Sequence, residues 1–235
     1  MFKVADIVFE AKNCGKTFSA RSLKYAFFGT EPELVIDVTD AEVAKHMEKH
    51  PGVEEEVFRY LLSGTAFYSA LIDRNGMLLH SSAVVKDGRA YLFTAGSGTG
   101  KSTHTGYWLE LFPDAYILND DKPAIRLVDG VFYAYGTPWS GKFDLSRNEG
   151  VPIGGIACVE RAKENFIEPM PTALAAAKLL SQTVRHLSEG RLNKLLDTMD
   201  LLIRAVPVYR LGCIADRSAA ELSSKVMTAA PDNNR

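Results

Sequence analysis

The chain has 235 residues, of which 46% are hydrophobic and 24% are charged, and both fractions are ordinary for a folded globular protein. Its 27 basic and 29 acidic residues leave a formal net charge of −2, which argues against a nucleic-acid-binding domain with a strongly basic face. The three cysteines, Cys14, Cys158 and Cys213, have no C-x-x-C spacing, so we expect neither a disulfide framework nor a zinc ribbon. Charged residues interrupt the N-terminus, and no apolar run is long enough to span a bilayer. We therefore expect a cytoplasmic protein without a membrane partner.

The apolar pattern of the first 74 residues predicts a small α+β subdomain. A strand is expected over 34–38, and a helix follows it, because apolar residues recur at spacings of three and four positions. These residues are Val53, Val57, Phe58, Leu61 and Leu62. Asn75-Gly76 is a strong turn signal, and we place the start of a second unit, residues 75–230, at this point.

The second unit alternates strands and helices, which predicts an α/β fold with a mixed sheet. The expected elements are a strand over 77–85, a turn at Asp87-Gly88, a strand over 90–94, a helix over 101–112, a strand over 115–118, a hairpin with its tip at Asp129-Gly130, a polar loop over 137–150 and a strand over 153–159. Two helices follow, the first with Thr172 as N-cap and the second with one apolar face formed by Leu192, Leu195, Leu196, Met199 and Leu202. A strand over 206–211 and a helix over 217–229 complete the unit, and the polar tail 231–235 is expected to fray.

Residues 95–103 read Ala-Gly-Ser-Gly-Thr-Gly-Lys-Ser-Thr and lie between a predicted strand and a predicted helix. Glycines let consecutive backbone N–H groups turn toward an anion, and the following helix directs its dipole at the same point. This pattern predicts that the phosphates of ATP bind to Gly96, Ser97, Gly98, Thr99, Gly100, Lys101, Ser102 and Thr103. Lys101 would reach the β- and γ-phosphates, and the Ser102 hydroxyl would bind Mg²⁺. Ala95 replaces the first glycine of the usual P-loop pattern, and alanine fits there if its φ is negative.

A pair of carboxylates, Asp120 and Asp121, follows the strand predicted over 115–118. Only one helix separates this pair from Lys101, so we expect a single βαβ crossover with adjacent parallel strands. Ligands of such sheets bind outside the carboxyl ends of the strands, so the pair and the glycine loop should face one site. One carboxylate would orient Mg²⁺, and the other would accept a proton from an attacking hydroxyl.

Two further segments are candidates for the site. His80 lies in the middle of the strand predicted over 77–85, where a histidine is more often structural than functional. The loop from Gly136 to Lys142 contains small residues around a lysine that could neutralise charge on an acceptor or on the phosphoryl group. The alternative for this loop is a solvated surface with Trp139 packed beneath it.

A histidine, a hairpin, the Gly-Ser-Gly-Thr-Gly-Lys-Ser-Thr loop, one helix and a strand ending in Asp-Asp together resemble HPr kinase/phosphorylase over residues 77–160. ATP-dependent phosphoenolpyruvate carboxykinases share that nucleotide core. The resemblance implies an HPr-kinase-like P-loop core and the use of Mg-ATP. It also implies His80 as the active-site histidine and Asp120 as the base, with Asp121 beside it at the metal. Which of the two carboxylates takes the proton stays open at this point.

The chain departs from the bacterial HPr kinases in two places. Their Glu-Ile-Arg-Gly-Leu-Gly signature has no counterpart, since Gly136 to Lys142 stands in that region, and the first 75 residues differ in character. The resemblance therefore implies a kinase whose acceptor is the serine of another protein or peptide, or a small-molecule alcohol. A homo-oligomer is compatible with these features. The alternative function is a regulatory ATP-sensing module or an ATPase without phosphotransfer, but the carboxylate pair and His80 favour the kinase.

Overall fold

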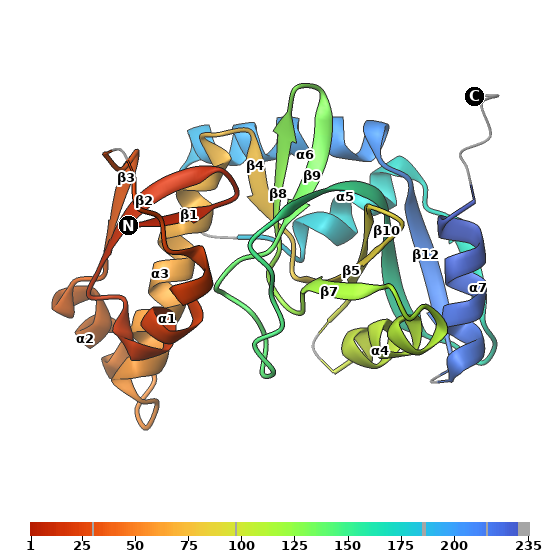
Figure 1. Ribbon diagram of the computed structural model, residues 1–235, viewed down its shortest axis with the longest axis horizontal. Helices are drawn as coiled ribbons and strands as arrows, with labels where there is room; N and C mark the ends of the chain where they lie inside the picture. The colour runs from red at the N-terminus through yellow and green to blue at the C-terminus, as the bar shows by residue number, and fades with distance from the viewer. Residues whose placement is uncertain (30, 97, 185–186, 215, 230–235) are drawn as a thin grey trace.

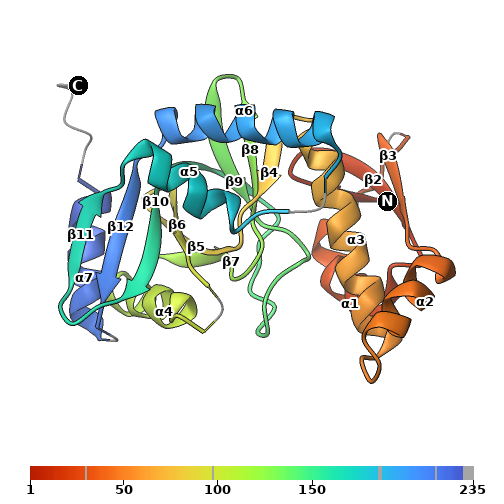
Figure 2. The same cartoon turned by 180° about the vertical axis from the view of Figure 1, so that it is seen from behind.

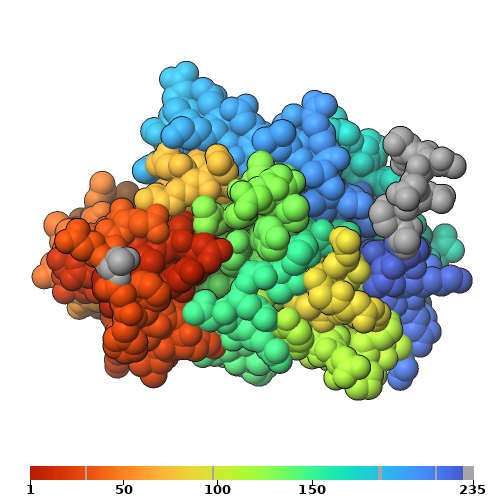
Figure 3. Space-filling model, turned by 45° about the horizontal axis from the view of Figure 1, so that its top comes forward, coloured from red at the N-terminus to blue at the C-terminus, as the bar shows by residue number. Residues whose placement is uncertain are grey.

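The computed structural model describes residues 1–29, 31–96, 98–184, 187–214 and 216–229, so the tail 231–235 lies outside the described residues. It is a mixed α/β molecule with a small three-stranded sheet at one end and a larger curled sheet in its centre (Figure 1). In the space-filling view the N-terminal unit, red to orange, lies at one end and α7, dark blue, at the other (Figure 3). No helix in the described part of the chain is both long and apolar enough to cross a membrane.

The N-terminal unit combines one small sheet with helices. Its elements are β1 (Phe2–Val4), β2 (Ile7–Lys12), α1 (Gly15–Arg21), η1 (Leu23–Tyr25), β3 (Leu34–Asp37), α2 (Asp40–Lys49) and α3 (Glu55–Ile72). The strand expected over 34–38 is confirmed as β3. Helix α2 was not predicted, although the sequence holds its start signal: Thr39 and Glu42 form a capping box in which each side chain accepts a hydrogen bond from the other's backbone N–H.

The helix predicted around residues 53–62 is α3, but it begins two residues later and continues to Ile72. Only part of the predicted apolar face is buried. Phe58 is 6% exposed, whereas Val57 and Leu61 are 42% and 46% exposed. The core side of α3 packs in one apolar cluster with Trp139 and Tyr135 from the second unit. The boundary near residue 74 stays a prediction.

The large sheet has the strand order β4-β8-β9-β10-β6-β5-β7, and β12 pairs with β10 and with β11. Its strands are β4 (Gly76–Leu78), β5 (Ser81–Lys86), β6 (Arg89–Thr94), β7 (Tyr116–Asn119), β8 (Ala124–Val128), β9 (Val131–Tyr135), β10 (Gly150–Arg161), β11 (Phe166–Pro169) and β12 (Val208–Cys213). The first residues of β10 pair antiparallel with β9, and its later residues pair parallel with β6 and β12, so one long strand joins the two halves of the sheet.

Helices cover both faces of this sheet (Figure 2). They are α4 (Lys101–Leu111) and α7 (Arg217–Met227) on one face and α5 (Thr172–Leu180) and α6 (Glu189–Ala205) on the other. Alternate side chains of β6 point to opposite faces of the sheet. Tyr91 and Phe93 pack in the cluster under α4 and α7, whereas Ala90 and Leu92 pack in the cluster under α5 and α6. This alternation is what a strand buried on both faces requires.

Two predictions about helices were wrong in detail. Helix α5 has Pro171 rather than Thr172 at its N-cap, since the backbone of Pro171 is extended and Thr172 is already helical. Helix α6 buries Leu195, Met199 and Leu202, but Leu192 and Leu196 are 39% and 42% exposed, so its apolar face is narrower than expected.

The single strand expected over 77–85 is broken into β4 and β5, and His80 lies in the break rather than in the middle of a strand. Strand β4 pairs with β8, whereas β5 pairs with β6 and β7, so the chain changes partners between the two strands. The backbone of His80 forms hydrogen bonds with groups other than the neighbouring strands. Its N–H donates to the carbonyl of Gln182 at 2.8 Å, and its carbonyl accepts from the Thr94 hydroxyl at 2.8 Å.

The prediction that the crossover through α4 joins two adjacent parallel strands was also wrong. Strands β6 and β7 are parallel, but β5 lies between them and is antiparallel to both. The reason is the tight turn at Asp87 and Gly88, whose φ angles of 51° and 71° suit a two-residue hairpin. This turn places β5 directly beside β6. The chain that leaves β6 through α4 therefore re-enters the sheet as β7 on the far side of β5.

Candidate active site

The glycine-rich loop connects the end of β6 to the start of α4, as predicted. Gly98 and Gly100 have φ angles of +74° and +111°, a backbone conformation that favours glycine. Ala95 is buried at the end of the strand and keeps a negative φ, so alanine is accommodated there. Gly100 is the N-cap of α4, which directs the N-terminus of this helix at the loop. Ser97 lies outside the described residues.

Lys101 is folded back onto the loop that precedes it. Its ammonium donates to the carbonyls of Ala95 at 2.9 Å and Gly96 at 3.3 Å, and the residue is only 9% exposed. Burial lowers the pKa of Lys101, and the nearby charge of Asp121 opposes this effect. The buried ammonium is therefore already positioned at the loop, where an anionic group would favour its charged form.

Two hollows meet at the glycine loop, and Gly98, Gly100 and Thr103 line both of them. The first, which we call the α7-side hollow, has a volume of about 530 Å³ and is also lined by Thr99, His104, Tyr107, Val159, Arg161, Ala162, Cys213, Ile214 and Asp216. The second, which we call the aspartate hollow, has a volume of about 390 Å³ and is also lined by His80, Lys101, Ser102, Asp120, Asp121, Gly141, Lys142 and Phe143. The structure thus brings the predicted catalytic and metal-binding residues to one hollow.

Asp121 is held by two basic side chains. Its Oδ1 lies 3.0 Å from Nε2 of His80, and its Oδ2 accepts from the Lys122 ammonium at 2.6 Å. Burial alone would raise the pKa of Asp121, but the hydrogen bond from His80 and the charge of Lys122 lower it to about 2. Asp121 is therefore a fixed anion, and Lys122 is a site residue that the sequence analysis missed.

Asp120 has a different environment. Burial raises its pKa, although the backbone N–H of Gly141 donates to its Oδ1 at 2.6 Å and opposes the shift. A Cβ on Gly141 would lie 2.9 Å from the other carboxylate oxygen, so a larger residue there would push the Asp120 carboxylate aside. Asp120 is the more basic of the two carboxylates and hence the better proton acceptor.

The turn that presents both carboxylates is fixed by Asn119, which is fully buried. Its Oδ1 accepts from the N–H groups of Asp121 at 2.9 Å and Lys122 at 2.7 Å, and its Nδ2 donates to the carbonyl of Thr137 at 3.0 Å. An asparagine directly before a turn is the sequence signal for this arrangement. The turn is rigid because its buried polar groups are paired.

The loop from Gly136 to Lys142 combines the two alternatives that the sequence left open. Trp139 is buried beneath it, with Nε1 donating to the Ser63 hydroxyl at 3.0 Å, while Lys142 is exposed and lines the aspartate hollow. The N-terminal unit holds this loop through Arg21, whose Nη1 donates to the carbonyl of Ser140 at 2.7 Å. Arg21 has no signal in the sequence, since the contact spans more than a hundred residues.

The donor set at the aspartate hollow fits Mg²⁺. In the part of the chain that the structure describes, no group of three or more His, Cys, Asp or Glu side chains could hold a metal ion. Magnesium is usually held by one or two carboxylates together with the phosphates of a substrate. Asp121 and the exposed hydroxyl-bearing Ser102 line the same hollow and match that requirement.

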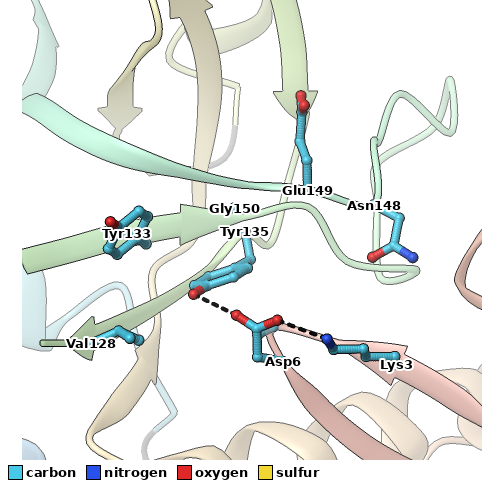
Figure 4. A pocket seen from close by; sticks show the side chains of 9 residues that line it. Lys3, Asp6, Val128, Tyr133, Tyr135, Asn148, Glu149 and Gly150 are labelled. Atoms are coloured by element: carbon cyan, nitrogen blue, oxygen red, sulfur yellow. Dashed lines mark hydrogen bonds and ion pairs between the residues drawn. The ribbon is translucent and has the colours of Figure 1, made fainter.

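A separate hollow of about 500 Å³ lies between the β1–β2 turn and the hairpin of β8 and β9 (Figure 4). Asp6 accepts from the Tyr135 hydroxyl at 2.9 Å and pairs with Lys3 at 3.2 Å, and the carboxylate of Glu149 is turned away from this group. None of the predicted site residues that the structure describes lines it.

We compared the chain with protein families, curated proteins and solved structures, and only the structures gave a match. No family model and no curated protein matches the chain. Among solved structures, the chain is similar to the HPr(Ser) kinase/phosphatase from Coxiella burnetii, with a TM-score of 0.36 and 10% sequence identity, over 63% of this chain and 95% of that chain.

Proposed function

We propose that this chain is an ATP-dependent kinase that transfers the γ-phosphoryl group to a hydroxyl. The observation that carries the proposal is the meeting of two hollows at Gly98, Gly100 and Thr103. A nucleotide whose phosphates lie on this loop would have one hollow for its nucleoside and the other for the acceptor. In-line transfer needs such an arrangement, because the attacking and leaving oxygens lie on opposite sides of the phosphorus.

Asp120 is the proposed base. Its raised pKa makes it the better acceptor for the proton of the hydroxyl as the hydroxyl oxygen bonds to the γ-phosphorus and ADP leaves. Lys101 would stabilise the charge that develops on the bridging oxygen. Lys142, on the opposite wall, would neutralise charge on the acceptor or on the phosphoryl group.

Ser102 and Asp121 would hold Mg²⁺ in this kinase. The ion, when bound, would neutralise charge on the phosphate oxygens. The pKa of about 2 keeps Asp121 anionic at all working pH values, as a magnesium ligand requires. His80 and Lys122 fix the orientation of this carboxylate.

The experiment is a transfer assay with γ-labelled ATP, a panel of serine-containing peptides and small alcohols. We expect Asp120→Asn to bind ATP while its transfer rate falls by about two to four orders of magnitude, because the amide cannot accept a proton. The wild-type rate should rise with pH through the raised pKa of Asp120, since only the carboxylate form is a base. Asp129→Asn, at the exposed tip of the β8–β9 hairpin, is the matched control and should keep full activity.

Retained transfer in Asp120→Asn together with loss in Asp121→Asn would reverse the two roles. Retention in both variants would refute the base assignment. ATP binding with no transfer to any acceptor would favour the alternative, a regulatory ATP-sensing module, which needs no proton acceptor.

A further inference from the structure

The α7-side hollow lies at the carboxyl ends of three parallel strands that run side by side (Figure 2). Strand β10 lies between β6 and β12, and in this part of the sheet it is parallel to both. Strand β6 leads into the glycine loop, β10 ends at Arg161, and Asp216 follows β12 as the N-cap of α7. A nucleotide whose phosphates lie on the glycine loop, and whose nucleoside follows this edge of the sheet, would therefore meet Arg161 first and Asp216 next.

Arg161 and Asp216 are the charged side chains that line this hollow in the described part of the chain. Burial lowers the pKa of His104 to about 4 and raises the pKa of the Cys213 thiol to about 11, so both of these lining groups are neutral near pH 7. Nη2 of Arg161 donates to the carbonyl of Gly98 at 3.2 Å, which places the cation at the glycine loop. Since a carboxylate repels phosphates, Asp216 suits the uncharged end of a nucleotide.

Asp216 is held in one orientation through one of its two oxygens. Its Oδ1 accepts from the Ser218 hydroxyl at 2.7 Å and from the Asn165 amide and the Ala219 N–H, both at 3.3 Å. The hydrogen bond from Ser218 lowers the pKa of Asp216, so the side chain is an anion near neutral pH. Its Oδ2 accepts no hydrogen bond from the described residues. One fixed acceptor is therefore left for a donor in the hollow.

The rest of the hollow suits a flat ring. Its apolar walls are formed by Tyr107, Val159, Ala162 and Ile214. Ile214 is 40% exposed, so part of this apolar surface is open to an occupant. Sites for small molecules commonly combine such walls with a few polar groups that fix orientation, and the volume of about 530 Å³ is typical of them. A heterocyclic base would bury its faces here and present an N–H group to Asp216.

The number of free oxygens distinguishes between the two common purines. Guanine presents two adjacent N–H donors, which a carboxylate meets with both of its oxygens, whereas adenine presents one amino group beside a ring nitrogen that only accepts. Asp216 has one oxygen left, because Oδ1 already accepts three hydrogen bonds. The site thus matches the single amino group of adenine.

We propose that Asp216 selects adenine nucleotides by accepting a hydrogen bond from the 6-amino group of the base in the α7-side hollow. The inference rests on the proposed function and deepens it, because it assigns the base of the nucleotide and the residue that recognises it. Asp216 takes no part in the transfer step, so base recognition is measured separately from transfer.

The test is calorimetry of the full chain with Mg²⁺ and without an acceptor, in which ATP, purine riboside triphosphate and GTP are titrated in turn. Purine riboside triphosphate differs from ATP only by the absence of the 6-amino group. We expect it to bind about tenfold more weakly than ATP, as the loss of one hydrogen bond to a charged group predicts. GTP should also bind more weakly than ATP.

Asp216→Asn and Asp216→Ser both remove the free carboxylate oxygen and keep a residue that caps α7 well. In Asp216→Asn the amide oxygen would accept the three bonds of Oδ1, so its NH2 group would stand where Oδ2 was. Both variants should bind ATP and purine riboside triphosphate with affinities within about twofold of each other. The matched control is Glu164→Gln, which removes one negative charge from the exposed turn between β10 and β11, outside the hollow, and should keep the preference.

Equal binding of ATP and purine riboside triphosphate to the wild type would overturn the inference and leave the proposed kinase intact. Tighter binding of GTP than of ATP would overturn it as well, and so would a preference for ATP that survives in both Asp216 variants. A preference that is lost in these variants, without transfer to any acceptor, would support the inference and refute the kinase. Binding of none of the three nucleotides would refute both.

Discussion

Asp120 and Asp121 are neighbours in the chain, yet their carboxylates have opposite environments. Burial raises the pKa of Asp120, whereas His80 and Lys122 outweigh burial at Asp121 and lower its pKa to about 2. Pairs of acids whose pKa values are moved apart in this way commonly take different roles. At this site the difference between the two pKa values arises because the turn after β7 places different side chains beside each carboxylate.

Lys101→Ala tests the glycine loop. We expect this variant to lose turnover and to bind Mg-ATP more weakly, because the ammonium that would contact the phosphates is removed. The fold should survive, since among the described residues the ammonium of this lysine donates to the backbone carbonyls of Ala95 and Gly96 and to no other group. Calorimetry measures the binding of Mg-ATP, and circular dichroism checks that the fold is intact. Binding and hydrolysis like those of the wild type would place the nucleotide elsewhere.

Lys142→Ala tests the opposite wall of the aspartate hollow. We expect a lower transfer rate or acceptor affinity, while the dissociation constant for ATP stays within about threefold, a change of about 0.7 kcal/mol. The reason is that Lys142 is exposed on the loop across from the glycine loop, with its ammonium 5.9 Å from the centre of the Phe143 ring. An unchanged rate at subsaturating acceptor would make the lysine an ordinary surface residue. A large loss of ATP affinity would move it into the nucleotide site.

At the scale of elements, the loop from Gly136 to Lys142 connects the N-terminal unit to the proposed base. Arg21 donates to the carbonyl of Ser140 and to the Tyr60 hydroxyl, both at 2.7 Å, and the next residue, Gly141, donates to Asp120. A hydrogen bond to a charged group contributes about 1.5–3 kcal/mol. We therefore expect Arg21 to act as a positioning residue through Gly141.

Arg21→Met should lower kcat by about tenfold and leave ATP binding unchanged, because the loop loses the bonds that hold it. The weakened bond from Gly141 would raise the pKa of Asp120 further, so the acid limb of the pH–rate profile should move to higher pH. Lys16→Met on the same helix is the control, since its exposed side chain does not contact the loop in the described structure. A lower rate with an unmoved acid limb would indicate a purely structural role for Arg21.

The sequence predicted features that are encoded by residues close together in the chain. It missed features that depend on contacts between segments distant in the chain. The glycine loop was predicted with its strand and helix, because its chemistry lies within nine consecutive residues. The break at His80 could not be predicted, because it reflects the exchange of β8 for β6 and β7 as partners, and these strands are distant in the sequence. The different environments of Asp120 and Asp121 also needed the structure, because Gly141, which donates to Asp120, lies 21 residues from it.

At the scale of the whole molecule, α4 and α7 are joined through a buried histidine. Nε2 of His104 lies 2.9 Å from the Ser223 hydroxyl, which also accepts from the Trp108 indole at 3.0 Å. Burial lowers the pKa of His104 to about 4 from its ordinary 6.5. The unfolded chain therefore binds a proton more readily than the folded one between these two pH values.

Acidification from pH 7 to pH 4 should thus cost about 3 kcal/mol of unfolding free energy through this residue, and the loss should be complete near pH 4. His104→Gln removes the titration, so we expect urea unfolding of this variant to show a smaller decrease in stability over that pH range. His50→Gln, at an exposed histidine, controls for the general effect of acid. Equal decreases in the wild type and in His104→Gln would show that His104 does not titrate in this way.

The position of β5 sets the distance between the two strand ends that carry the proposed site. Neighbouring strands lie about 4.8 Å apart, so the ends of β6 and β7, with β5 between them, are about 10 Å apart. Strands lying side by side would have halved that separation. A two-residue turn at Asp87 and Gly88, far from any reacting atom, therefore determines how far apart the strand ends that carry the glycine loop and the carboxylates lie.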